Sequence, residues 1–204
     1  NAFKVLGASY AVHRCLQEHT FPSGVTFATA TDGNHGRAVA WTARRLGHAA
    51  VVFVPRNTAK ARIEAIANEG ARVVVVDGTY DDAVRRAADD AAVHGWQVIS
   101  DTGYAGYLQI PDWIMEGYTT LFQEAVDRLD AVGGCSPHVV LLQAGVGGLA
   151  CAGVRFFRRR DAATRPRLIV VEPADADCLF ELISSPGGSI REGRGAQRSI
   201  MAGL

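Results

Sequence analysis

The feature of this sequence that most constrains its fold is the regular alternation of short apolar runs with helix-like segments. The runs "AAVVFVP" (49–55), "ARVVVVD" (71–77) and "RLIVVEP" (167–173) are nearly continuous in apolar residues instead of alternating with polar ones. Such runs are typical of strands buried on both faces of a sheet. Because helix-like segments separate them, the strands would form βαβ units. The sequence therefore predicts an α/β fold built on doubly wound parallel sheets.

The bounds of the predicted elements follow from the period of the apolar positions and from glycine and proline breaks. We expect helices at 3–18, 35–47, 58–70, 80–95, 112–129 and 147–160. We expect strands at 25–30, 49–55, 71–77, 96–100, 138–144 and 167–173. The 204 residues are 48% apolar, which is enough to bury a core. The chain begins with Asn1 and stops after "SIMAGL", so we expect a fragment cut at both ends.

Composition excludes several classes of function. The chain carries 21 basic and 21 acidic residues and has a pI near 7.2, which leaves no basic field for nucleic acid or an anionic membrane. No apolar run approaches the roughly 20 residues that span a bilayer, and no signal peptide is visible. The four cysteines form no CxxC pair, and the six histidines show no HxxxH spacing. We therefore expect reduced thiols in a cytoplasmic protein and no metal site.

The turn "TDGNHG" (31–36) follows a predicted strand directly. Ligands of open α/β sheets bind at the carboxyl ends of strands, so this is a candidate site. Gly33 and Gly36 permit a sharp turn. Asn34 can direct its amide at a ligand, and Asp32 adds a carboxylate. Capping of the following helix is the alternative interpretation, because Asp and Asn are both good caps.

A second candidate is the glycine-rich segment "QAGVGGLA" (143–150), between a predicted strand and a predicted helix. Backbone N–H groups there, with the helix N-terminus, can cradle a phosphate. The residues that would supply them are Gly145, Val146, Gly147 and Gly148. The segment is not a P-loop, and the GxGxxG spacing would need a glycine where Ala150 stands. A plain tight turn is the alternative.

Two more residues could carry chemistry. Asp101, in "SDTGY" (100–104), also follows a predicted strand, although a lone turn aspartate is more often simply solvated. Lys4 lies in the apolar stretch "NAFKVLGA" (1–8). A lysine there either extends its ammonium to solvent or is held with a lowered pKa for covalent chemistry. These residues alone leave both alternatives open.

Three features follow one another along the sequence: a lysine on a helix, then a Gly-Asn-His-Gly turn, then a glycine loop beyond position 140. In this the chain resembles the fold-type-II pyridoxal-phosphate enzymes, the tryptophan-synthase-β type, which include threonine dehydratase, serine racemase and cysteine synthase. The segments "NAFK", "TDGNHGR" and "LLQAGVG" are most similar to the branch that removes ammonia from 2,3-diaminopropionate. The resemblance covers essentially the whole chain, and it implies pyridoxal 5'-phosphate as the cofactor.

The resemblance also implies roles for individual residues. Lys4 would be the Schiff-base residue, Asn34 would contact the ring hydroxyl, and the glycine loop would hold the phosphate. Asp32 replaces the serine or other small residue that is usual in the wider family. It would act as a base on the face opposite Lys4, so that D and L substrates are both accepted. Asp101 matches a carboxylate of the family's site and would help to protonate the leaving amino group, directly or through a water.

The implied reaction is the α,β-elimination of a small amino-acid substrate, D- or L-2,3-diaminopropionate, to pyruvate and ammonia. A related threonine or serine dehydratase is one alternative, and an inactive truncated copy that serves only as a binding domain is another. The resemblance implies a homodimer when full length, a smaller lobe at 24–109 and an incomplete larger lobe at 1–23 and 110–204. It places the contact to the pyridine nitrogen beyond Leu204, so we expect little or no activity from these 204 residues alone.

Overall fold

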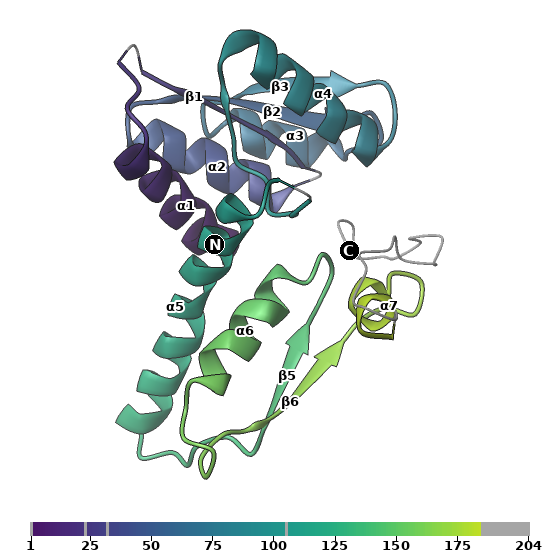
Figure 1. The fold of residues 1–204 in the computed structure, drawn as a ribbon. Coiled ribbons are helices and arrows are strands. Elements are labelled where there is room, and N and C mark those ends of the chain that lie inside the picture. The colour runs from purple at the N-terminus through teal and green to yellow at the C-terminus, as the bar shows by residue number, and fades with distance from the viewer. Residues whose placement is uncertain (1, 23, 32, 105, 185–204) are drawn as a thin grey trace. The chain divides into compact units, whose positions relative to one another are not determined.

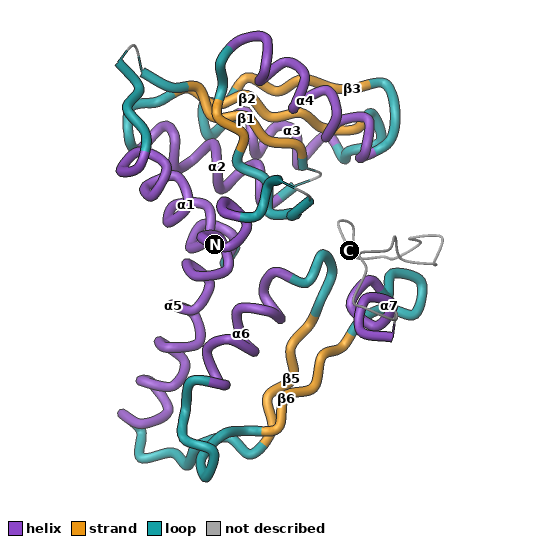
Figure 2. The backbone as a smooth tube through the Cα atoms, viewed as in Figure 1, coloured by secondary structure: helices purple, strands orange, loops and turns teal. Residues whose placement is uncertain are grey.

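The computed structural model describes residues 2–22, 24–31, 33–104 and 106–184. The chain divides into two compact units, unit 1 (Asn1–Gly117) and unit 2 (Tyr118–Leu204). Strands and helices alternate in both units (Figures 1 and 2). Among the described residues, every pair of strands is parallel, which confirms the predicted fold class.

Unit 1 contains a four-stranded parallel sheet with the strand order β3-β2-β1-β4. Its strands are β1 (Thr26–Ala30), β2 (Ala49–Pro55), β3 (Arg72–Val76) and β4 (Gln97–Val98). Its helices are α1 (Lys4–Glu18), α2 (Asn34–Arg45), α3 (Lys60–Ala67), α4 (Tyr80–His94) and the first part of α5 (Gln109–Ala131).

Helices cover both faces of the central strands of this sheet. On one face, small residues of α4 such as Ala87 pack against Ala28 and Phe53. On the other face, Val52 and Ile66 belong to one buried cluster that joins β2 to α3. α2 lies so close to the same face that a Cβ at its Gly36 would overlap the Val52 side chain. The predicted burial of continuous apolar strands on both faces is confirmed for β2, but β3 at the edge of the sheet contains no buried residue.

The order of the strands brings two loops to one edge of the sheet. β4 pairs with β1, and Ala28 lies opposite Val98. Because the two strands are parallel, the turn before α2 and the segment after β4 leave the sheet side by side. α1 packs against α2 beside this edge (Figure 1). The first turn of α1, which begins at Lys4, therefore faces the carboxyl ends of the strands.

Unit 2 contains the two-stranded parallel sheet β5 (Val139–Gln143) and β6 (Arg167–Val171), with α6 (Gly148–Arg158) between them in the chain. α6 packs tightly on its surroundings, since a Cβ at Gly153 would lie 2.9 Å from Leu142 and from Phe122. Several apolar side chains of this sheet are more exposed than the prediction of strands buried on both faces allows. Leu141 is 66% exposed, and Val171 is 52% exposed.

The structure differs from the predicted elements at the start of one helix and in one additional helix. α5 begins at Gln109 and not after Pro111, because a proline in the first turn of a helix removes no needed N–H. A short helix that the sequence analysis did not predict, α7 (Cys178–Ser184), follows β6. The Glu172 carboxylate accepts bonds from the N–H groups of Leu179 and Phe180 at 2.8 and 2.9 Å. This capping group lies too far upstream in sequence to resemble a usual N-cap.

Candidate active site

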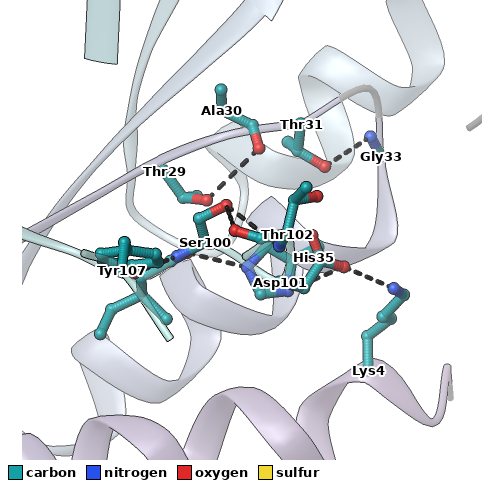
Figure 3. Close-up of polar contacts among 11 residues, drawn as sticks. Lys4, Thr29, Ala30, Thr31, Gly33, His35, Ser100, Asp101, Thr102 and Tyr107 are labelled. Atoms are coloured by element: carbon teal, nitrogen blue, oxygen red, sulfur yellow. Dashed lines mark hydrogen bonds and ion pairs between the residues drawn. The ribbon is translucent and has the colours of Figure 1, made fainter. Parts of the chain in front are cut away.

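The central feature of the site is an ion pair between Lys4 and Asp101. Nζ of Lys4 donates to Oδ2 of Asp101 at 2.6 Å, although the two residues are 97 positions apart (Figure 3). The Lys4 side chain is 22% exposed and that of Asp101 is 11% exposed. The structure thus brings together two residues that the sequence analysis singled out separately, and both side chains are largely shielded from solvent.

The environment of Asp101 keeps its carboxyl group ionised. Burial raises the pKa of Asp101, but the neighbouring His35 and Lys4 outweigh it and lower the pKa to about 2. Near neutral pH, Asp101 therefore accepts hydrogen bonds and stabilises a nearby cation.

His35 joins the turn before α2 to the segment after β4. It is 4% exposed, and its Nε2 lies 2.9 Å from the carbonyl oxygen of Ile99. Its Nδ1 lies 3.7 Å from Oδ2 of Asp101 (Figure 3). The sequence analysis did not select His35 as a site residue. Its position next to Asn34 in the Gly-Asn-His-Gly turn was the available signal.

The turn itself is described except at Asp32, which lies outside the described residues. The N–H of Gly33 donates to Oγ1 of Thr31 at 3.0 Å, which closes the turn behind β1. Gly33 is the N-cap of α2 and offers no side chain as a cap. Asn34 is the first residue of α2 and is exposed, so that its amide is accessible to a ligand.

Tyr107 supports the segment that carries Asp101. Its hydroxyl donates to the carbonyl of Val98 at 3.0 Å and accepts from the N–H of Ser100 at 2.9 Å (Figure 3). The ring stacks on Tyr104 with centroids 4.9 Å apart. Burial raises the pKa of Tyr107, although the bond from Ser100 opposes it, so the phenol remains protonated. This support was not predicted, because tyrosines in a glycine-containing loop have no characteristic spacing.

The predicted phosphate loop lies in unit 2, where Gly145 and Val146 follow β5 and Gly148 begins α6. Gly147 is the N-cap of α6 with φ +85°, a left-handed conformation that favours glycine. Because Gly147 has no side chain, it cannot accept hydrogen bonds from the N–H groups of the first turn of α6. A Cβ at Gly148 would meet only the Tyr118 ring, at 3.7 Å. The backbone donors and the absence of an acidic side chain in that turn suit an anion.

Within the described parts of the chain, no cluster of three or more His, Cys, Asp or Glu side chains could hold a metal ion. None of the described helices has the length and apolarity required to cross a membrane.

Comparison with known proteins adds independent findings. The family model for pyridoxal-phosphate dependent enzymes matches residues 1–203. Diaminopropionate ammonia-lyase of Escherichia coli K12 is 42% identical over the whole chain, which covers 54% of that relative. Mouse L-serine dehydratase/L-threonine deaminase is 37% identical in sequence. The match covers 65% of this chain and 37% of the mouse protein. The crystal structure of holo diaminopropionate ammonia lyase from E. coli superimposes with a TM-score of 0.83 over 89% of this chain and 50% of that one. The chain thus spans about half the length of these ammonia-lyases.

Proposed function

Since this chain belongs to the family of pyridoxal-phosphate-dependent enzymes, we propose that the whole protein converts 2,3-diaminopropionate to pyruvate and ammonia. The observation that carries this proposal is the 42% identity to a diaminopropionate ammonia-lyase over the full chain. The matching serine dehydratase covers only 65% of the chain, and it supports a dehydratase as the second candidate.

The described residues fit the cofactor. Lys4 and Lys60 are the two lysines of these 204 residues, and the Lys60 side chain is 90% exposed. Lys4 is the lysine whose side chain is partly buried within the candidate site, and it is therefore the proposed point of attachment. Asn34 for the ring hydroxyl, and Gly145, Val146, Gly147 and Gly148 for the phosphate, complete the proposed set. When bound, the cofactor supplies an electron sink for the charge that develops at the substrate's α-carbon.

The Lys4–Asp101 pair supports a proton-transfer role for Lys4. Free Lys4 can take up the substrate's α-proton at Nζ, and Asp101 at 2.6 Å stabilises the ammonium that results. Because the pKa of Asp101 is lowered to about 2, this carboxyl holds no proton near neutral pH. A proton for the leaving amino group is then better supplied by the Lys4 ammonium or a water than by Asp101 itself.

Further parts of the proposal rest on the family resemblance. Asp32 is the proposed base on the face opposite Lys4, which would extend the reaction to both enantiomers. The smaller lobe at 24–109, the larger lobe at 1–23 and 110–204, and a homodimer of the full-length enzyme belong to the same proposal. A cytoplasmic location remains a prediction from the sequence.

The proposal is tested with the purified full-length protein by measuring pyruvate release from D- and L-diaminopropionate, serine and threonine. We expect kcat/KM for diaminopropionate to exceed that for serine by on the order of a hundredfold, because a site built for a polar group discriminates strongly. A preference for serine or threonine would support the dehydratase instead. A protein that gains no visible cofactor band would support an inactive binding domain.

A further inference from the structure

Unit 2 carries a surface pocket of about 560 Å³ at the end of α6, which the proposed function does not use. Figure 1 shows the later part of α5 lying beside α6. Phe156 of α6 lines the pocket, together with Arg159 and Arg160, which directly follow the helix. Thr120 and Glu124 line it from α5. Because sites for small ligands in proteins have volumes of this order, the pocket is large enough for a metabolite-sized molecule.

Phe156 forms an apolar wall of the pocket, and two neighbouring rings hold its own ring in place. The Phe156 ring stacks on the ring of Phe122 with the centroids 6.0 Å apart, and it meets the ring of Phe157 edge-on at 5.0 Å. Phe122 and Phe157 are both buried. Since these two rings fix its orientation, Phe156 presents a flat apolar surface and loses little side-chain freedom when a ligand binds.

Arg159 and Arg160 supply two positive charges that are not used to cap the helix. Nη2 of Arg165 donates to the carbonyl oxygens of Arg158 and Arg160 at 2.9 and 3.1 Å, and it thereby caps the C-terminus of α6. Among the ion pairs between described residues, none involves Arg159 or Arg160. The Arg160 guanidinium lies instead 6.0 Å from the centroid of the Phe156 ring. Both guanidinium groups are therefore available to a ligand of the pocket.

The balance of charge at the pocket is positive. Of the described residues that line it, Glu124 alone is acidic, so its lining carries two positive charges and one negative charge. The C-terminal end of a helix disfavours anions, but this effect is weak at a surface and is screened by salt. Arg165 also places a further cation on that end of α6. The pocket therefore favours an anionic ligand over a cationic one.

The side chains of the lining match one class of ligand. A guanidinium group offers paired, planar donors that suit the oxygens of a phosphate or a carboxylate. An aromatic ring such as that of Phe156 packs well against another flat ring. We propose that this pocket binds a small anion in which a phosphate or a carboxylate is carried by a flat ring. Arg159 and Arg160 hold the anionic group, Phe156 packs against the ring, and Thr120 and Glu124 accept hydrogen bonds from polar substituents of the ring.

This site is distinct from the glycine loop, which is the other candidate anion site of unit 2. The loop lies at the beginning of α6, whereas the pocket lies at its end. An α-helix rises by about 1.5 Å per residue, so the 11 residues of α6 separate the two by roughly 16 Å. The inference does not depend on the proposed function, because neither the cofactor nor its chemistry enters it.

The test uses the full-length protein with saturating pyridoxal phosphate, which keeps the probes off the glycine loop. Isothermal titration calorimetry compares phenyl phosphate and benzoate, which join an anion to a ring, with inorganic phosphate and phenol, which each lack one of these parts. We expect phenyl phosphate or benzoate to bind at one site on the order of tenfold more tightly than inorganic phosphate and phenol. The tighter of the two identifies the anionic group. Phenol that binds as tightly, or an absence of saturable binding by phenyl phosphate and benzoate, would overturn the proposal.

Three single substitutions assign the binding to the pocket. Arg159→Gln and Arg160→Gln should each weaken binding of the tighter probe on the order of ten- to a hundredfold, as for a lost hydrogen bond to a charged group. Arg158→Gln is the matched control, because it removes the same charge from the same helix end but does not line the pocket. Its affinity should stay within about twofold of the wild type, since salt screens a charge that makes no contact. An equal loss in Arg158→Gln, or unchanged affinity in both other variants, would place the probe elsewhere and overturn the proposal.

A measurement on the wild type keeps the test decisive if a variant folds poorly. Phenylglyoxal modifies accessible arginines, and mass spectrometry gives the rate at each of them. The tighter probe should slow the modification of Arg159 and Arg160 and leave that of Arg158 unchanged. Equal rates at Arg159 and Arg160 with and without the probe would also overturn the proposal. Pyruvate release enters none of these measurements, so a failure of the proposed lyase activity is detected separately.

Discussion

Unit 1 and unit 2 are built from the same kind of sequence, yet the candidate functional groups that each carries differ in chemical kind. Unit 1 has its central strands covered on both faces and presents charged side chains, with Lys4 and Asp101 in contact. Unit 2 has strands with exposed apolar residues, and its glycine loop presents backbone N–H groups. A continuous apolar run thus predicts a strand reliably, but whether that strand is covered depends on what else packs on the sheet.

The largest effect should come from removing the lysine in unit 1. In the full-length enzyme, Lys4→Ala should reduce pyruvate release to background and abolish the cofactor adduct trapped by borohydride, because the attachment point is lost. Lys60→Ala is the matched control, since Lys60 lies in the same unit and is 90% exposed. A trapped adduct that persists in Lys4→Ala would assign the covalent role to another lysine.

Asp32 offers the next largest effect and sharpens the assignment of chemistry to unit 1. Asp32→Asn should depress turnover of one enantiomer of diaminopropionate by on the order of 10²–10⁴-fold, the usual loss for a general base. The other enantiomer should be much less affected. Steady-state kinetics on both enantiomers decide the matter, and equal losses would mean that Asp32 orients the ring or balances charge instead.

Unit 2 is tested at its glycine loop with two neighbouring substitutions. Gly148→Ala adds a methyl group that meets only Tyr118, so stability should hold while cofactor affinity falls by on the order of tenfold through a displaced phosphate contact. Gly147→Ala places a side chain at φ +85° and 2.8 Å from Leu179, so it should also lower the free energy of unfolding by about 1–2 kcal/mol. Cofactor titration and urea unfolding measure both. Wild-type affinity in Gly148→Ala would reduce the loop to a tight turn.

The smallest expected effect comes from truncating one strand residue in each unit, a buried one in unit 1 and an exposed one in unit 2. In the 204-residue chain, Val52→Ala should lower the free energy of unfolding by about 2 kcal/mol, because Val52 is fully buried in β2. Leu141→Ala in β5 should cost less than about 0.5 kcal/mol, as an exposed substitution does. Urea unfolding gives both values. A large cost for Leu141→Ala in this chain would mean that its face is covered after all.

The sequence predicted most of the helices and strands, but it did not predict the contacts between them. Continuous apolar runs located β2, β3 and β6 within two residues, because burial and period act locally. α7 was not predicted, because Glu172 caps it from outside the usual capping positions.

For the site, Lys4, Asn34 and Asp101 could be selected as candidates from their neighbours in sequence and from the resemblance. The contact between Lys4 and Asp101 could not be predicted, since this ion pair depends on the pairing of β4 with β1. His35 was overlooked for the same reason. Ile99 and Asp101 come close to His35 only through the pairing of β4 with β1.

The 97-residue separation of Lys4 and Asp101 also sets the time at which the site can first exist. At a synthesis rate of roughly 5–20 residues per second, Lys4 leaves the ribosome about 5–20 s before Asp101 does. The sheet must also wait, because β4 is made last and pairs with the strand made first. Contacts of such long range form slowly in folding. A nascent chain therefore carries the Lys4 amine well before the Asp101 carboxylate that will hold it, and the ion pair can form only after β4 has been made.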